Sequence, residues 1–278
     1  MRPHRHGTGK SAVKVGIAGL GTIGFNVAKA LDDGIEGLEL VGVVARDRGK
    51  AEDRLTALRH PPAVVSAGEL AAVSDIVVEC VPKAAFMEIA EPALKAGRIF
   101  VTVSGAGILA NPEAVEMARA NGARIILATG ALLGLDAVRA AAEGTVHEVC
   151  MVTRKPPNAL RGAPYLVEND ISVDNLTEAK KVFEGSARDG AQGFPANVNV
   201  AAALGLAGIG ADRTKLEIWA DPALDRNTHT IRVDADSARF EMTIENVQSE
   251  ENPGTGKITA LSVIACLRGL SAPLKVGT

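Results

Sequence analysis

A glycine-rich turn near the N-terminus limits what this chain can fold into more than any other feature of its sequence. The turn reads Gly19-Leu20-Gly21-Thr22-Ile23-Gly24, and it lies between the apolar run 13–18 and an amphipathic stretch. A GxGxxG pattern between a strand and a helix is typical of the phosphate-binding turn of a dinucleotide fold. An ordinary strand-turn-helix without a ligand is the alternative, because glycine accounts for 29 of the 278 residues.

Each glycine of this pattern has its own role in such a fold. The first permits a tight turn, the second lets the backbone approach a pyrophosphate, and the third lets helix and strand pack closely. Free N–H groups at the helix N-terminus then face the phosphates. The residues that we expect to contact the dinucleotide are Gly19, Gly21, Thr22, Ile23 and Gly24.

The composition indicates a globular chain and argues against a polyanionic partner. A length of 278 residues is enough for two domains, and 47% hydrophobic residues can bury a sizeable core. The formal net charge is −3, from 30 basic and 33 acidic side chains, and only 3% of residues are aromatic. Nucleic-acid binding, which relies on basic patches and stacking aromatic rings, is therefore not expected.

The cysteines and the termini suggest a reduced, cytoplasmic protein without a membrane span. Cys80, Cys150 and Cys266 are far apart, and neither a CxxC motif nor a Cys/His cluster has metal-ligand spacing, so we expect no metal site. Residues 1–11 are basic and polar, and they read as a flexible tail rather than a signal peptide. Apolar stretches stay shorter than the roughly 18 residues that a membrane span needs.

Up to about residue 130, short β-branched runs alternate with helical patterns. The expected strands are 13–18, 38–44, 76–81, 99–103 and 124–128. Such alternation predicts an α/β fold with a Rossmann-type, doubly wound parallel sheet over residues 12–130. Ligands of these sheets bind beyond the carboxyl ends of the strands.

After about residue 145 the pattern changes to that of an α+β domain with a mostly antiparallel sheet. The expected strands are 146–153, 215–220, 228–233 and 239–244, and the expected helices are 177–184, 197–208 and 258–267, with a loop over 158–176. We assign residues 131–251 to this catalytic and oligomerisation domain. We expect residues 252–278, which include the last helix, to pack back onto the first domain. Such sheets often pair across a two-fold axis, which favours a homodimer.

Few residues offer acid/base chemistry or carboxylate binding. Histidine is the natural acid/base near neutral pH, and His229 opens an expected strand on the same face as Ile231 and Val233. A hydrogen-bonded core histidine is an equally good interpretation from spacing alone. Arg154 and Lys155 could bind carboxylates, although they could also be solvated residues at a strand end.

The choice between NAD and NADP depends on the end of the second strand. NAD enzymes commonly place an acid there, about 20 residues past the glycine turn. The segment here reads Ala45-Arg46-Asp47-Arg48, in which Asp47 comes late and either arginine could bind a 2′-phosphate. Solvated arginines are the alternative. We expect use of both cofactors, with a lean towards NADP and a contact from Arg46.

Several further segments occur in a recognisable order. They are, after the glycine turn, Val78-Glu79-Cys80, 129–137 (TGALLGLDA), Arg154-Lys155-Pro156, 183–189 (FEGSARD), 194–200 (FPANVNV), Ala220-Asp221-Pro222, Asn227-Thr228-His229 and 251–255 (ENPGT). Together they resemble the L-aspartate dehydrogenase family, over nearly the whole chain from about residue 12. These later segments are far more specific than the glycine turn.

The resemblance implies an NAD- or NADP-dependent oxidative deamination of L-aspartate. The product would be iminosuccinate, which hydrolyses to oxaloacetate and ammonia or supplies NAD biosynthesis. The family's catalytic histidine matches His229, and its cofactor contacts in the second half match Ala131 and Asn199. We add to this our own inference that Arg154 and Lys155 hold the two substrate carboxylates.

The sequence departs from the family pattern at three turns. Thr129 stands where serine is usual, Pro82-Lys83-Ala84-Ala85 replaces a small-residue or histidine-containing turn, and Ser104-Gly105-Ala106-Gly107 replaces Ser-Val-Gly-Ala. These changes leave room for two alternatives. One is a dehydrogenase of the same architecture that acts on another small amino dicarboxylate. The other is a non-catalytic, dinucleotide-binding sensor.

Overall fold

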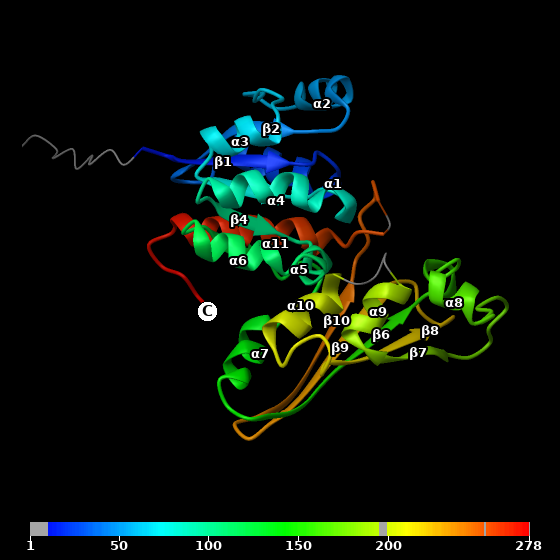
Figure 1. Cartoon of the computed structure of the whole chain (residues 1–278). Coiled ribbons are helices and arrows are strands. Elements are labelled where there is room, and N and C mark those ends of the chain that lie inside the picture. The colour runs from blue at the N-terminus through cyan, green and yellow to red at the C-terminus, as the bar shows by residue number, and fades with distance from the viewer. Residues whose placement is uncertain (1–10, 195–198, 253, 278) are drawn as a thin grey trace, which may run out of the picture.

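The computed structural model describes residues 11–194, 199–252 and 254–277, and in this part the chain forms two five-stranded sheets (Figure 1). The predicted tail, apart from residue 11, and Asn197 lie outside the described residues. Among the described helices, none has the length and apolar character that crossing a membrane requires. The same residues contain no group of three or more His, Cys, Asp or Glu side chains that could hold a metal ion.

The first sheet is wholly parallel, with the strand order β2-β1-β3-β4-β5. Its strands are β1 (Val13–Ala18), β2 (Leu38–Val44), β3 (Ile76–Glu79), β4 (Ile99–Thr102) and β5 (Arg124–Leu127). Each forms within the expected range, and the last three end one or two residues early. The predicted Rossmann-type sheet is therefore confirmed.

Helices cover both faces of this sheet, as the doubly wound prediction requires (Figure 1). On one face α1 (Thr22–Asp32) packs beside α11 (Lys257–Ser271), whose Val263 and Leu267 enter the same core as Val15 and Ile17. The other face carries α3 (Ala67–Val73), α4 (Phe86–Lys95) and α6 (Glu113–Ala120). Two further helices follow strands at the carboxyl edge: α2 (Arg48–Leu55) and α5 (Gly105–Ala110).

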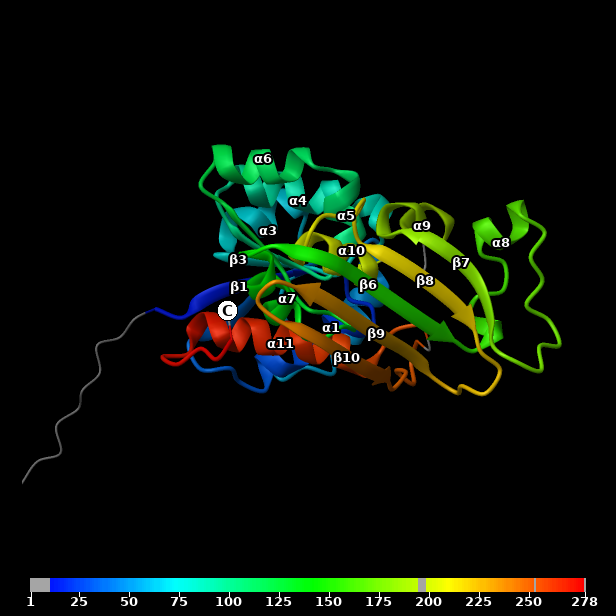
Figure 2. The same cartoon turned by 90° about the horizontal axis from the view of Figure 1, so that it is seen from below.

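The second sheet has the order β10-β9-β6-β8-β7, and only the β6–β8 pair is parallel. Its strands are β6 (Val146–Lys155), β7 (Lys180–Ser186), β8 (Lys215–Ala220), β9 (Asn227–Ala235) and β10 (Arg239–Asn246). One face packs under α7 (Leu135–Ala142), α9 (Ala187–Gly193) and α10 (Asn199–Ala207). Figure 2 shows the opposite face, which no helix of the described chain covers. The mostly antiparallel prediction is confirmed.

One predicted element has the wrong type. Residues 177–184 were expected to form a helix, but the chain forms strand β7 at the edge of the second sheet instead. The register shifts between Lys181 and Phe183, so that the consecutive residues Val182 and Phe183 are both buried. Such a bulge removes the alternation that marks a strand in a sequence, and pairing with β8 overrides the local helical preference.

Two smaller differences concern the preceding segment. The expected loop 158–176 contains the short helix α8 (Pro164–Glu168) and overlaps the 3-10 turn η2 (Pro157–Ala159). Strand β6 continues to Lys155, two residues past the expected end, and stops before Pro156, which has no N–H group for a ladder. Because side chains alternate along a strand, this extension places Arg154 and Lys155 on opposite faces of the sheet.

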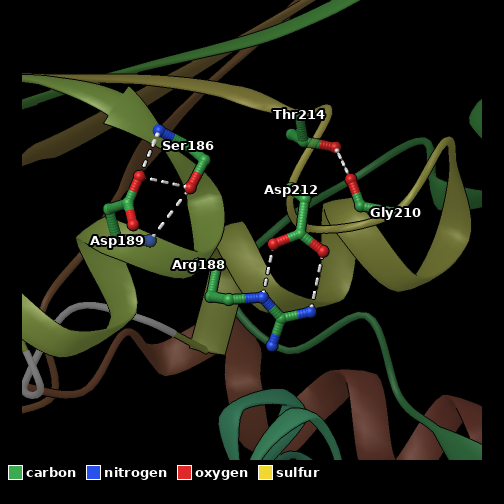
Figure 3. Close-up of polar contacts among 6 residues, drawn as sticks. All are labelled: Ser186, Arg188, Asp189, Gly210, Asp212 and Thr214. Carbon is green, nitrogen blue, oxygen red and sulfur yellow. Dashed lines mark hydrogen bonds and ion pairs between the residues drawn. The ribbon is translucent and has the colours of Figure 1, made fainter.

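Local polar contacts fix the junction between β7 and α9 (Figure 3). Ser186 caps the helix: its Oγ accepts a hydrogen bond from the Asp189 N–H at 3.1 Å, and its own N–H donates to the Asp189 carboxylate at 3.3 Å. Arg188 then grips both carboxylate oxygens of Asp212, at 2.5 and 2.9 Å. This bidentate pair ties α9 to the turn before β8, and so holds the helix over the sheet.

Candidate active site

A cavity of about 140 Å³ lies where the two sheets meet, between the start of α1, the loop after β5, and the ends of β6, β9 and β10. Five residues that the sequence predicted as site residues line it. They are Ile23, Ala131, Lys155, Asn199 and His229. The loop before α11 closes it with Gly254, Thr255 and Gly256. The tertiary fold therefore gathers residues that lie more than 200 positions apart in the sequence.

The glycine turn fits a dinucleotide pyrophosphate. A Cβ on Gly19, whose φ is +94°, would lie 2.6 Å from the Cys80 carbonyl oxygen, and a Cβ on Gly24 would lie 1.8 Å from the Gly19 oxygen. Gly21, the N-cap of α1, has no heavy atom of the described chain within 4 Å of its Cβ position. The first and third glycines are thus required by packing. The second leaves open space beside helix N–H groups, where a phosphate can approach.

His229 lies on β9 opposite Thr153 of β6, and only 3% of its surface is exposed. Its Nδ1 shares a hydrogen bond of 3.1 Å with the Thr153 hydroxyl. Burial, together with the positive charge of Lys155, lowers the pKa of His229 to about 3. The imidazole is therefore neutral at physiological pH, and it can accept a proton when a ligand changes its surroundings.

Lys155 ends β6, two residues past Thr153, so that its side chain lies on the same face of the sheet as His229. The side chain is 6% exposed, and burial lowers the pKa of Lys155 to about 8. The ammonium group is therefore mostly charged at pH 7 and half deprotonated near pH 8. A buried cation in a cavity beside a neutral imidazole favours an anionic ligand.

Arg154 lies on the opposite face, away from the cavity. Its Nη1 donates to Asp221 Oδ2 at 3.2 Å, and the guanidinium carbon lies 4.8 Å from the centre of the Trp219 ring. The alternation of strand β6 therefore separates the two cations that are adjacent in the sequence. The structure brings Lys155 to the cavity and leaves Arg154 on the uncovered face of the second sheet.

Asn199, the first residue of α10, connects the two halves of the molecule. Its side-chain oxygen accepts a hydrogen bond of 3.2 Å from the backbone N–H of Ala106, in the turn that departs from the family pattern. The neighbouring Gly105 allows this approach, because a Cβ there would lie 3.0 Å from the Asn199 carbonyl oxygen. The altered turn 104–107 thus packs against a cavity-lining residue. In contrast, none of residues 82–85 lines the cavity.

Asn246 is a cavity residue that sequence analysis missed. It ends β10, directly opposite Asn227 of β9, and its Nδ2 donates to the Ala131 carbonyl at 3.0 Å. From the other side, the Ser262 hydroxyl accepts a hydrogen bond of 3.1 Å from the Gly130 N–H. The loop that carries Ala131 is therefore held by β10 and α11 together. The two asparagines could have been noticed as polar residues just outside the expected strands 228–233 and 239–244, at the open end of the hairpin that these strands form.

A second missed residue, Glu79, supports the carboxyl edge of the first sheet. Its carboxylate is fully buried and accepts hydrogen bonds from the Val81 N–H at 2.8 Å, Thr102 Oγ1 at 2.5 Å and Ser104 Oγ at 3.2 Å. Burial raises its pKa, which these hydrogen bonds partly oppose. The carboxylate joins the loops after β3 and β4, both of which face the cleft. The Val-Glu-Cys motif was the only sequence signal for it.

Family models match the chain in two blocks. The model of the aspartate dehydrogenase C-terminal domain matches residues 136–270, and that of the homoserine dehydrogenase NAD-binding domain matches residues 19–128. The second match agrees with the glycine turn and the parallel sheet. The first half of the chain is therefore a nicotinamide-dinucleotide-binding domain.

Full-length relatives carry the assignment further. L-aspartate dehydrogenase of Bradyrhizobium diazoefficiens is 57% identical, over 98% of this chain and 96% of the relative. L-aspartate dehydrogenase 3 of Bordetella bronchiseptica is 51% identical, over 95% of this chain and 97% of the relative. The crystal structure of aspartate dehydrogenase from Thermotoga maritima aligns with a TM-score of 0.73 at 25% identity, over 95% of this chain and 99% of that one. This chain belongs to the L-aspartate dehydrogenase family.

Proposed function

We propose that this chain catalyses the NAD(P)-dependent oxidative deamination of L-aspartate to iminosuccinate, which water converts to oxaloacetate and ammonia. The reverse direction is the reductive amination of oxaloacetate. One observation carries the proposal: buried His229 and Lys155 share a cavity with the end of the dinucleotide-binding turn. The likeness to named L-aspartate dehydrogenases over nearly the full length supports aspartate as the substrate.

In this proposal the chain's own groups hold the cofactor at two points. The N–H groups at the start of α1 bind the pyrophosphate beside Gly21, which leaves space for it. Ala131 and Asn199 contact the nicotinamide end, because they line the same cavity as His229. Asn246 acts as a positioning residue through its hydrogen bond to the Ala131 carbonyl.

Lys155 binds a carboxylate of the substrate. L-Aspartate carries two carboxylates at neutral pH, and a buried ammonium group attracts them more strongly than an exposed one. Arg154 contacts Asp221 and Trp219 on the other face of the sheet. We therefore assign the carboxylate contact to Lys155.

His229 handles the protons of the reaction. When bound, the nicotinamide ring supplies the acceptor for the hydride that leaves Cα of aspartate. The amine nitrogen must lose a proton as the C=N bond forms, and His229 accepts it on Nε2 in the tautomer whose Nδ1–H donates to Thr153. The same imidazole then assists the water that adds to the imine carbon, after which ammonia leaves. The negative charge of the bound dicarboxylate raises the pKa of His229 towards the working range.

The test is the initial rate of NAD(P)H formation with L-aspartate, for the wild type and for His229→Ala. We expect the variant to lose roughly 100-fold or more in kcat, the scale of general acid–base catalysis. Calorimetric binding of the dinucleotide should survive the substitution, because His229 does not belong to the turn. A matched control is His60→Ala, which changes an exposed histidine next to Asp32.

Three outcomes separate the proposal from its alternatives. No turnover of aspartate, despite tight dinucleotide binding, contradicts it. Faster turnover of another amino dicarboxylate, such as L-glutamate, transfers the same mechanism to a different substrate. Turnover of no amino dicarboxylate by either protein, with equal dinucleotide binding by the wild type and His229→Ala, favours a non-catalytic sensor.

We also propose that two copies of the chain pair through the uncovered face of the second sheet (Figure 2). This face carries ordered side chains, including Trp219 under Arg154, the Thr230–Thr243 hydroxyl pair at 2.9 Å and the Arg232–Glu241 ion pair at 2.6 Å. Sedimentation of the wild type and Thr230→Glu tests it. A dimer that the substitution leaves intact contradicts this interface.

The proposed domains, 12–130 and 131–251 with 252–278 returning to the first, are testable by limited proteolysis.

A further inference from the structure

The end of strand β2 lacks the carboxylate that NAD-dependent folds use to hold the ribose hydroxyls. That acid is expected about 20 residues past the glycine turn, which corresponds to the end of β2 at Val44 and the position after it. The chain places Ala45 there, followed by Arg46. The Gly19 N–H donates to the Val44 carbonyl at 2.8 Å, so this strand end adjoins the glycine turn.

The nearest acid, Asp47, is already engaged. It is the N-cap of α2, and its Oδ1 accepts a hydrogen bond from the Lys50 N–H at 3.1 Å. Its Oδ2 lies 3.5 Å from the Lys50 ammonium, and the hydrogen bond to Lys50 N–H is the main cause that lowers the pKa of Asp47. Both oxygens therefore serve the first turn of the helix. Turning this carboxylate towards a ribose would remove the cap.

The two arginines beside Asp47 differ in whether their side chains are already paired. Arg48 Nε is paired with Glu52 Oε1 at 2.8 Å, one helical turn further on. Arg46 is exposed, and it has no hydrogen-bond or ion-pair partner among the residues that the structure describes. It lies two residues past Val44, which contacts the glycine turn, and so within about 7 Å of it along the backbone. Arg46 is thus an exposed cation next to the strand end that adjoins the glycine turn.

We infer that Arg46 selects the cofactor by binding the 2′-phosphate of NADP(H), and that this chain prefers NADP(H) to NAD(H). A guanidinium fork matches a phosphate group and keeps its charge at every working pH. NAD(H) offers hydroxyls at this position, and the described segment 44–48 holds no carboxylate to receive them other than Asp47, which caps α2. The inference rests on the proposed function only in requiring that the glycine turn binds a dinucleotide.

Calorimetric titration tests this without any turnover. The ligands are NADP⁺ and NAD⁺, with adenosine 2′,5′-bisphosphate and AMP as fragments that isolate the 2′-phosphate. Wild-type protein should bind NADP⁺ at least about tenfold more tightly than NAD⁺. Arg46→Ala should weaken NADP⁺ and the bisphosphate by roughly 10- to 100-fold, the scale of charge-assisted phosphate contacts, and change NAD⁺ and AMP less than about twofold.

Two further variants sharpen the test. Arg48→Ala is the matched control, because it removes a neighbouring arginine that is paired with Glu52, and it should keep the preference for NADP⁺. The double variant Ala45→Asp with Arg46→Ala should reverse the preference, since it restores the acid and removes the cation. A conservative Arg46→Lys variant should retain part of the NADP⁺ affinity.

Several results would overturn the inference. They are wild-type preference for NAD⁺, equal weakening of both dinucleotides by Arg46→Ala, and a loss in Arg48→Ala that matches it. Binding of neither dinucleotide also overturns it, because the glycine turn then has another role. A clear NADP⁺ preference that depends on Arg46, without any turnover of aspartate, supports the inference and contradicts only the proposed function.

Discussion

Burial of Lys155 should make the stability of the fold depend on pH in a way that a single substitution removes. The pKa of this lysine is lowered from 10.5 to about 8 by burial. Below pH 8 the lysine is charged in both the folded and the unfolded chain, so the folded state carries the full cost of burying the charge. A difference of about 2.5 pKa units corresponds to about 3 kcal/mol.

The free energy of unfolding rises with pH wherever the unfolded chain binds more protons than the folded chain. Between pH 8 and 10.5 the unfolded chain still holds the proton that the folded chain has lost, so this group's contribution to the free energy of unfolding rises with pH. Lys155→Met removes the titration and keeps the volume. The stability of the wild type relative to this variant should therefore increase by about 2–3 kcal/mol between pH 7 and pH 10.

Urea unfolding at several pH values measures this difference, and comparing two proteins cancels the effects of other groups. Lys95→Met is the control, because it removes a lysine that is exposed on α4 beside Glu91 and therefore carries no burial cost. Parallel stability profiles for the wild type and Lys155→Met would refute the argument, because they would mean that burial leaves the pKa of Lys155 near its ordinary value.

The same ionisation should appear in ligand binding. Succinate carries two carboxylates and no amine, so its inhibition constant reports on the protein's groups. Its affinity should fall as the pH rises through about 8 in the wild type, and Lys155→Met should bind it weakly at every pH. An affinity that stays constant to pH 9 would exclude Lys155 as the carboxylate-binding group.

Three further predictions concern the cavity and the turn. Because burial lowers the pKa of His229 to about 3, NMR titration of its ring protons in the ligand-free protein should show no transition between pH 5 and 8; a midpoint near 6.5 would contradict this. Asn246→Ala should weaken dinucleotide binding roughly tenfold, because it removes the hydrogen bond to the Ala131 carbonyl, and calorimetry that gives an unchanged affinity would show that this contact is dispensable. Gly24→Ala should destabilise the fold by about 2–3 kcal/mol, because its Cβ would lie 1.8 Å from the Gly19 carbonyl oxygen; an unchanged urea midpoint would contradict the close packing of helix and strand.

The sequence by itself determined the first domain closely. Strand β1 (Val13–Ala18) and strand β2 (Leu38–Val44) begin and end where the apolar runs do, because parallel strands buried on both faces read as continuous hydrophobic segments. The glycine turn also follows from sequence, since its conformation is set within six residues. His229 could be placed on the buried face by period-2 alternation with Ile231 and Val233.

Only the tertiary structure decided the features that depend on partners distant in sequence. The bulge that makes 180–186 a strand exists because β8 pairs with it. Lys155 and Arg154 were indistinguishable in the sequence. The extension of β6 placed Lys155 in the cavity and Arg154 on the opposite, uncovered face of the sheet. Asn246 meets Ala131 across 115 residues. Local patterns record backbone preference and burial, whereas a site is made by contacts between elements that only folding brings together.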